Sequence, residues 1–148
     1  MIFSTFWTQL KAIEEAIAIT SPVSLKVKKA YWGAPALALP DHPAIFNTLT
    51  EPDRILNFGS RDQRMSIDIQ LLVNVAPSEV ERTSEIATAF WFAAKDAFDK
   101  NTTINSTVSF STLRGGNPTV PVILTHAGIA YIGFSGTLDI HDAKQFTF

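Results

Sequence analysis

The stretch NFGSRDQRMSIDIQLLVNV, residues 57–75, decides the fold of this chain. From Met65 onward the odd positions are apolar and the even positions are mostly polar. This alternation is typical of a β-strand that buries one of its faces. A glycine and a tight charge cluster, residues 59–64, come directly before the strand. We therefore predict a hairpin with strands at 54–58 and 64–75 and a charged tip between them.

Apolar residues at helical spacing precede the hairpin. They predict an amphipathic helix from about residue 4 to 19, which ends at the sequence Thr20-Ser21-Pro22. Its apolar side is made by the following residues: Phe3, Phe6, Trp7, Leu10, Ile13, Ala16 and Ile17. Its other, exposed side is expected to carry Gln9, Lys11, Glu14 and Glu15.

A second helix is predicted directly after the hairpin. Pro77 and Ser78 form a good helix start, because Ser78 fits the N-cap position and Glu81, three residues on, completes a capping box. The helical spacing continues to about Lys100. Alanines on its apolar stripe let this helix approach a sheet closely.

Residues 33–52 contain four prolines, which cannot donate ladder hydrogen bonds. They predict a long ordered loop or arm rather than a strand. The arm nevertheless carries five large apolar residues: Leu37, Leu39, Ile45, Phe46 and Leu49. A freely solvated loop has no need of them, and loops of this length usually cover a surface or serve a function.

The remaining segments read as strands and turns. Short strands are predicted at 23–27 and 30–32, and three more follow the second helix at 104–110, 120–126 and 130–140, with turns at 114–118 and 127–128. This order predicts a single α+β domain over residues 1–148, with a mostly antiparallel sheet, two helices on one face and a short tail at 143–148.

Composition narrows the function classes. The chain has 148 residues, of which 46% are hydrophobic and 18% charged, and its net charge is −2. That is a globular composition without the basic patch that sequence-specific nucleic-acid binding needs. The absence of cysteine excludes disulfides and thiolate chemistry. The longest apolar run, around 87–94, is too short to cross a membrane, and no signal-peptide pattern is present.

One constellation is a candidate metal site. His126, Asp139 and His141 are residue types that bind zinc or iron, and the last two share a strand face. The alternative interpretation is a polar outer strand face. His42 has no nucleophile partner in the sequence, and the glycine pair 115–116 lacks the Lys-Ser/Thr ending of a phosphate-binding loop. We therefore predict no catalytic site, no resident metal and no cofactor.

What remains in the sequence is a signal for assembly. The predicted hairpin tip mixes both charge signs, the arm is apolar, and the chain ends in two phenylalanines. Arginine makes geometrically specific pairs, and aromatic side chains often anchor interfaces. The predicted interface residues are Arg54, Arg61, Asp62 and Arg64 at the tip, Leu37, Leu39 and Phe46 in the arm, and Phe146 and Phe148 in the tail. Head-to-tail contacts between copies lead naturally to closed rings.

The layout as a whole resembles the tail terminator, or tail-completion, proteins of long-tailed bacteriophages. The resembling pieces are the first helix, the hairpin DRILNFGSRDQRMSIDIQLLVNV, the helix SEVERTSEIATAFWFAAKDAF and the ending GIAYIGFSGTLDI. The resemblance implies a homohexameric ring in the neck of the virion. The ring would cap the tail tube protein and join it to the head-side connector, after assembly in the host cytoplasm.

Two alternatives stay open. Another phage neck or minor tail protein, such as one that completes the head–tail connector, would have a similar sequence pattern. A small-molecule-binding α+β domain would use Trp7, Trp91 and the phenylalanines to line a pocket between sheet and helices.

Overall fold

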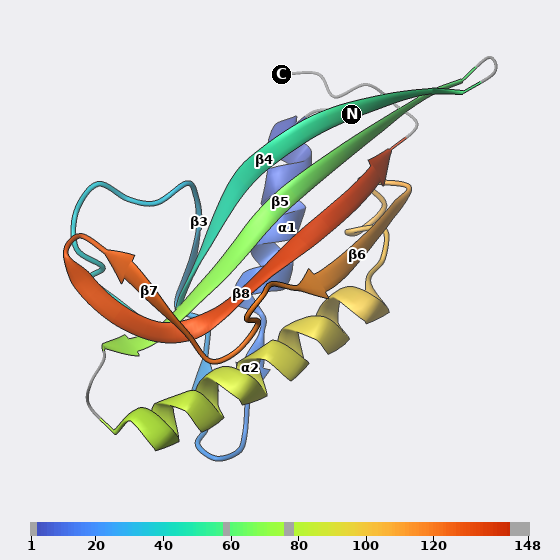
Figure 1. Cartoon of the computed structure of the whole chain (residues 1–148). Coiled ribbons are helices and arrows are strands. Elements are labelled where there is room, and N and C mark those ends of the chain that lie inside the picture. Colours follow the sequence, from blue (N-terminus) through green and yellow to red (C-terminus); the bar gives the residue numbers. More distant parts are fainter. Residues whose placement is uncertain (1–2, 58–59, 76–78, 143–148) are drawn as a thin grey trace.

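The computed structural model describes residues 3–57, 60–75 and 79–142. Two long helices and one large sheet make up most of it (Figure 1). In chain order the elements are α1 (Phe3–Glu15), β1 (Ala18–Ile19), β2 (Leu25–Lys26), β3 (Lys29–Trp32), β4 (Ala44–Asn57), β5 (Ser60–Val75), α2 (Val80–Lys100), β6 (Phe110–Gly115), β7 (Val122–His126) and β8 (Ile129–Asp142).

The main sheet has the strand order β3-β4-β5-β8-β6, and β7 also pairs with β8. Only β3 and β4 are parallel; the other pairs in this sheet are antiparallel. The two short strands β1 and β2 form a separate antiparallel pair. The predicted α+β class, with a mostly antiparallel sheet in one domain, is confirmed.

Strand β8 is held along both of its edges. One edge pairs with β5 over Tyr131–Asp142. On the other edge β7 pairs with the first part of β8 and β6 with the last part. Between these two strands, Ser135 exchanges backbone hydrogen bonds with the connecting segment, since Gly116 N–H donates to Ser135 O (3.0 Å) and Ser135 N–H donates to Thr119 O (2.9 Å). The outer ladder of β8 therefore continues across the gap between β7 and β6.

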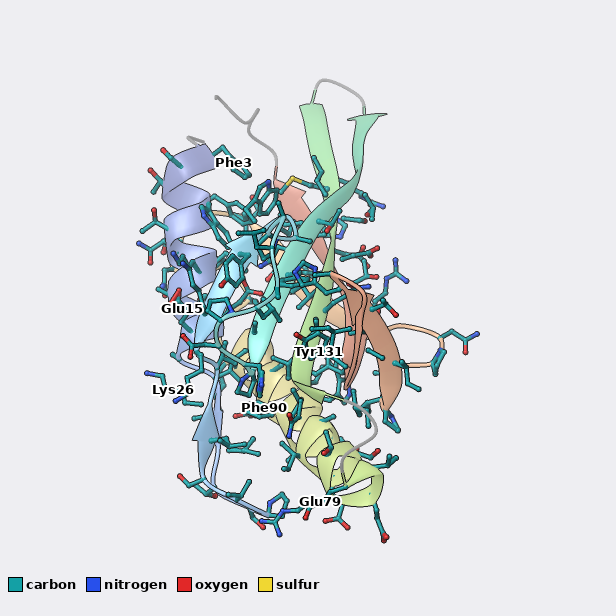
Figure 2. All side chains as sticks on the ribbon, turned by 90° about the vertical axis from the view of Figure 1, so that its left-hand side faces the viewer. Phe3, Glu15, Lys26, Glu79, Phe90 and Tyr131 are labelled. Carbon is teal, nitrogen blue, oxygen red and sulfur yellow. The ribbon has the colours of Figure 1, made fainter. Side chains whose placement is uncertain are left out.

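The alternation in β5 builds the core. Its odd residues from Met65 to Val73 are buried, in one cluster with side chains from both helices (Figure 2). The largest fully buried members of that cluster are Phe6, Leu10, Ile45, Ile67, Ile69, Leu71, Phe90, Phe98, Ile104, Leu113 and Phe134. The same alternation places Val73 on the inner face and Leu72 on the outer face. One side of the sheet is thus sealed by α1 and α2.

Several predicted boundaries are wrong. Helix α1 ends at Glu15, and the predicted arm ends at Pro43, because β4 begins at Ala44. The prolines of 33–52 predict a loop because proline cannot donate a ladder hydrogen bond. Pro52 lies beyond the last residue of β4 that pairs with β3, where β4 has only one neighbour. Proline is tolerated in such an edge strand.

The predicted strand at 104–110 is also wrong. Residues 104–106 have positive φ and form turns. The strand is β6, which starts only at Phe110 and ends at Gly115. It therefore contains Arg114 and Gly115, which were predicted to form a turn. Polar side chains hold the turns: Asn105 N–H donates to Asn101 Oδ1 (2.9 Å), and Thr107 Oγ1 donates to Ile104 O (2.7 Å). Such local bonds compete with strand pairing. The buried Ile104 and Val108 anchor these turns to the core.

The start of α2 differs as well. Glu79, with φ of 45°, occupies the N-cap position and makes no side-chain capping bond. Ser78, the predicted N-cap of a capping box with Glu81, lies outside the described residues.

Replacing Gly133 tests the close contact between β5 and β8. A Cβ added there would overlap the Leu71 carbonyl group of β5. Because β5 is held by strands on both sides, it cannot move away easily. We expect Gly133→Ala to lower the free energy of unfolding by about 3 kcal/mol, measured by urea unfolding. Ser135→Ala, on the same strand, is the control and should cost less than about 1 kcal/mol. Equal midpoints for the two variants would contradict this packing.

Candidate assembly surface

The β4–β5 hairpin is longer than the rest of the sheet. Pairing of β4 with β3 ends at Asn47, and pairing of β5 with β8 ends at Gln63, whereas β4 and β5 pair with each other as far as Asn57 and Ser60. We call residues 48–57 and 60–66 the ribbon. Figure 1 shows its far end projecting past the other elements. In the described part of the chain, β4 has no strand on its outer edge from Thr48 onward.

The outer edge of the ribbon is protected against simple strand addition. A β-bulge interrupts the register between Leu49 and Glu51, and Pro52 removes one backbone donor. Bulges and prolines are two ways in which proteins prevent edge strands from pairing with other chains. Contacts of the ribbon with a partner are therefore expected to use side chains on its faces.

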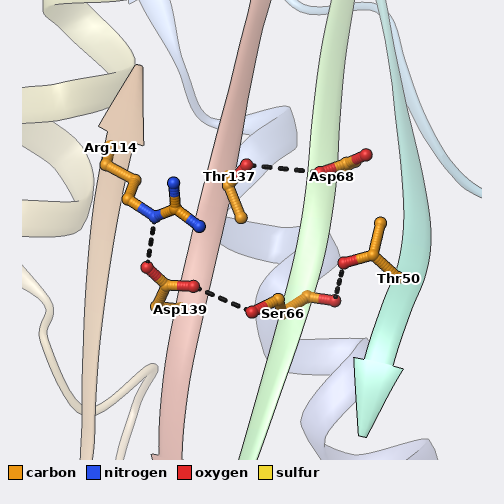
Figure 3. A network of polar contacts seen from close by, with 6 residues as sticks. All are labelled: Thr50, Ser66, Asp68, Arg114, Thr137 and Asp139. Atoms are coloured by element: carbon orange, nitrogen blue, oxygen red, sulfur yellow. Dashed lines mark hydrogen bonds and ion pairs between the residues drawn. The ribbon is translucent and has the colours of Figure 1, made fainter. Parts of the chain in front are cut away.

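The face of the sheet that the helices leave open carries a polar network (Figure 3). Asp139 accepts from Arg114 Nε (2.6 Å) and from Ser66 Oγ (2.9 Å). Thr137 Oγ1 donates to Asp68 (3.2 Å), and Thr50 Oγ1 donates to the Ser66 carbonyl oxygen (2.9 Å). These side chains come from four adjacent strands, so the network runs across the sheet and ends at the base of the ribbon.

The charged part of this network is exposed to solvent. The side chains of Arg114 and Asp139 are 61% and 30% exposed. The hydrogen bond from Arg114 to Asp139, and then the charge of Asp139, raise the pKa of Arg114 above its ordinary value. Solvent screens such a pair strongly, so its contribution to stability is small. The network leaves the open face polar and fixes its side chains.

Truncation of Arg114 tests whether its ion pair with Asp139 contributes little to the stability of the fold. We expect Arg114→Ala to change the free energy of unfolding by less than about 1 kcal/mol. Leu113→Ala, at the buried neighbouring position, should cost about 2–5 kcal/mol because it leaves a cavity in the core. Urea unfolding of the two variants gives the comparison. A loss of more than 2 kcal/mol for Arg114→Ala would instead make the network part of what stabilises the fold.

The other end of the open face is apolar and covered. Phe46, Leu72 and Tyr131 are buried there in a second small cluster, together with Ala44. The segment 33–43 lies against it through Leu39.

Two histidines complete this covered end. His126 Nε2 donates to the Leu37 carbonyl oxygen (2.8 Å), and the rings of His42 and Tyr131 lie 6.3 Å apart between centroids. The first half of the predicted arm therefore packs on its own subunit.

This arrangement corrects part of the predicted interface. Phe46 is only 5% exposed and belongs to β4, so it is not a free interface residue. Leu39 is half-buried in the same cluster, while Leu37 is 80% exposed. Arg64 lies exposed on β5, at the base of the ribbon.

Other predicted interface residues are only partly located. Arg54, Arg61 and Asp62 belong to the strands of the ribbon, but their side chains lie outside the described part. Phe146 and Phe148 lie outside the described residues altogether.

The candidate metal residues do not come together. His126 and Asp139 lie near opposite ends of the β7–β8 hairpin, about 30 Å apart at the rise of an extended strand. Asp139 binds Arg114, and His141 lies beside Phe110, with 6.2 Å between ring centroids. Within the described ranges, no three His, Asp or Glu side chains group as metal ligands, and neither helix is both long and apolar enough to cross a bilayer.

The aromatic residues that were candidates for a ligand pocket pack against one another. Trp7 lies against Trp32 (5.5 Å between ring centroids), and Trp91 lies against Phe134 (5.2 Å). One notable residue was missed. Glu14 was expected on the exposed side of α1, yet it is fully buried. Its position four residues after Leu10, on the apolar stripe, was the available signal.

No protein-family model, curated protein or solved structure matches the chain.

Proposed function

We propose that this chain is a structural virion protein, a tail terminator that forms a ring, caps the tail tube and joins it to the head-side connector. The observation that carries the proposal is the ribbon, which extends beyond every strand that flanks it in the described structure. The resemblance in element order to tail terminators supports the same function. A different protein of the phage neck or tail is the nearest alternative.

The ribbon has a physical reason to bind a partner. Residues 48–57 of β4 span about 30 Å at the rise of an extended strand. Among the described residues, 55–57 and 60–62 at the far end of the ribbon pair only with each other. Isolated two-stranded hairpins are marginally stable in water. A neighbouring copy that receives the ribbon would supply the missing buried surface. The same contact repeated head to tail closes into a ring, for which the resemblance suggests six copies.

The open face supports a role in assembly in a second way. It is polar and hydrogen-bonded within the subunit, so it stays soluble before assembly while the helices cover the other face. The charges at the base of the ribbon have both signs, with Arg64 and Arg114 close in register to Asp68 and Asp139. Surfaces with both signs can match copies of themselves, which fits a homo-oligomer. The expected partners are further copies, the tube protein and the head-side connector.

Shortening the ribbon tests the proposal. Residues 54–63 are replaced by Asn-Gly, which joins Asp53 to its register partner Arg64 through a two-residue hairpin turn. We expect a folded monomer by circular dichroism and light scattering, whereas the natural chain forms a ring. The control is Ala127→Asn, which places the same Asn-Gly pair in the β7–β8 turn and should leave the ring intact. A natural chain that stays monomeric at high concentration, with tube protein present, would exclude a ring-forming terminator.

Charge reversal tests the arginines of β5 within the ribbon. We expect Arg61→Glu with Arg64→Glu to raise the protein concentration needed for assembly by at least about tenfold, without changing the melting temperature. The matched control is Lys26→Glu with Arg82→Glu, which makes the same charge change at exposed positions away from the ribbon. Sedimentation at several protein concentrations measures both. Equal assembly of the two double variants would exclude Arg61 and Arg64 from the interface.

A further inference from the structure

Glu14 is an ionisable group buried at the C-terminal end of α1. Its side chain has no exposed surface, and its Oε1 accepts a hydrogen bond from Asn47 Nδ2 (2.7 Å). Its Oε2 has no hydrogen-bond partner in the described structure, and neither has Asn47 Oδ1. A carboxylate buried with a single donor is unfavourable, because charge needs several donors or a counter-ion once it leaves water. The site suits the neutral acid.

Asn47 marks the place where the ribbon leaves the sheet. It is the last residue of β4 that pairs with β3. Its Nδ2 also donates to the Tyr31 carbonyl oxygen (3.2 Å), and its own carbonyl oxygen accepts from Gly33 N–H (2.7 Å). One side chain therefore connects α1, β3 and β4 at the base of the ribbon.

The charged groups around this site do not offset a negative charge on Glu14. On α1 the nearest are Glu15 and Lys11, whose Nζ lies 3.7 Å from Glu15 Oε1. On β3, the Lys29 ammonium lies over the Tyr31 ring, which belongs to the cluster on the opposite face of the sheet. The part of β4 that is described with side chains, residues 44–50, contains no ionisable residue.

We propose that Glu14 and Asn47 form a proton-dependent latch, which fixes the end of α1 to the base of the ribbon and opens when Glu14 loses its proton. The inference concerns the single subunit and does not depend on ring formation. An open latch removes the hydrogen bond that joins the end of α1 to the base of the ribbon, while the strand pairing there remains.

The direction of the pH effect follows from the burial. Burial raises the pKa of Glu14 from 4.5 to about 8; the Asn47 hydrogen bond opposes this rise, and the charge of Glu15 adds to it. The closed latch thus binds a proton that the open or unfolded chain has already lost. The stabilisation is complete below pH 4.5, decreases as the pH rises to about 8, and stays low above that. Across this window the equilibrium for closing falls by on the order of a thousandfold.

Hydrogen exchange of single amides measures the latch. The Gly33 amide, which donates to Asn47 O, reports on it, and the Lys28 amide, which donates to Pro43 O (2.8 Å), is the internal control. After correction for intrinsic exchange, we expect opening at Gly33 to increase by about tenfold per pH unit between pH 5.5 and 7.5. Opening at Lys28 should change much less. Glu14→Gln should remove the pH dependence at Gly33, while Glu15→Gln should retain it.

A second measurement uses the natural protein, so it does not depend on whether Glu14→Gln folds. The side-chain carboxyl carbon of Glu14 in the natural protein, followed by NMR, should titrate with a midpoint near 8. A midpoint near 4.5 would overturn the latch. So would a Gly33 amide that follows intrinsic exchange at every pH, or the same pH-dependent opening in folded Glu14→Gln.

Discussion

The fold depends on β5 having two different faces. Its inward residues bury themselves under α1 and α2, its outward residues stay polar along most of the strand, and its two edges pair with β4 and β8. A slip of one residue would move every inward side chain to the open face, so the register is strongly determined. The other elements take their positions from this strand. The helices cover its apolar face. Its first residues form the ribbon together with β4, which extends beyond the strands that flank it.

The open face of the sheet divides into two unlike halves. At one end, the apolar Leu72 faces outward, and Phe46 and Tyr131 join it under the segment 33–43. At the other end, Ser66, Asp68 and Asp139 hold one another and the exposed Arg114 in place. The first half is closed by the subunit itself and the second is left to solvent. That contrast leaves the exposed, polar part of the open face at the end towards the ribbon.

Much of this arrangement could be predicted from the sequence. The physical basis of those predictions also explains which features could not be predicted. Alternation in β5 and β8 and helical spacing in α1 and α2 are local signals, and they predicted the fold class and the hairpin. The predicted charged tip at 59–64 is wrong in extent, because residues 60–64 belong to β5. Whether Pro52 allows a strand depends on which strands lie beside it, which is information about the tertiary structure. The burial of Glu14 depends in the same way on Asn47, which is distant in sequence. The polar network joins residues of four strands, so no local sequence pattern predicts its hydrogen bonds.

The continuous pairing of β8 has a consequence for how copies of this protein can associate. The strand is bonded to β5 on one side and to β7, the 116–119 segment and β6 on the other. Releasing it for exchange with the equivalent strand of another molecule would break ladders on both sides at once, and would uncover Phe134 and Leu138. Domain swapping through this strand is therefore disfavoured, so copies that associate would do so as folded subunits.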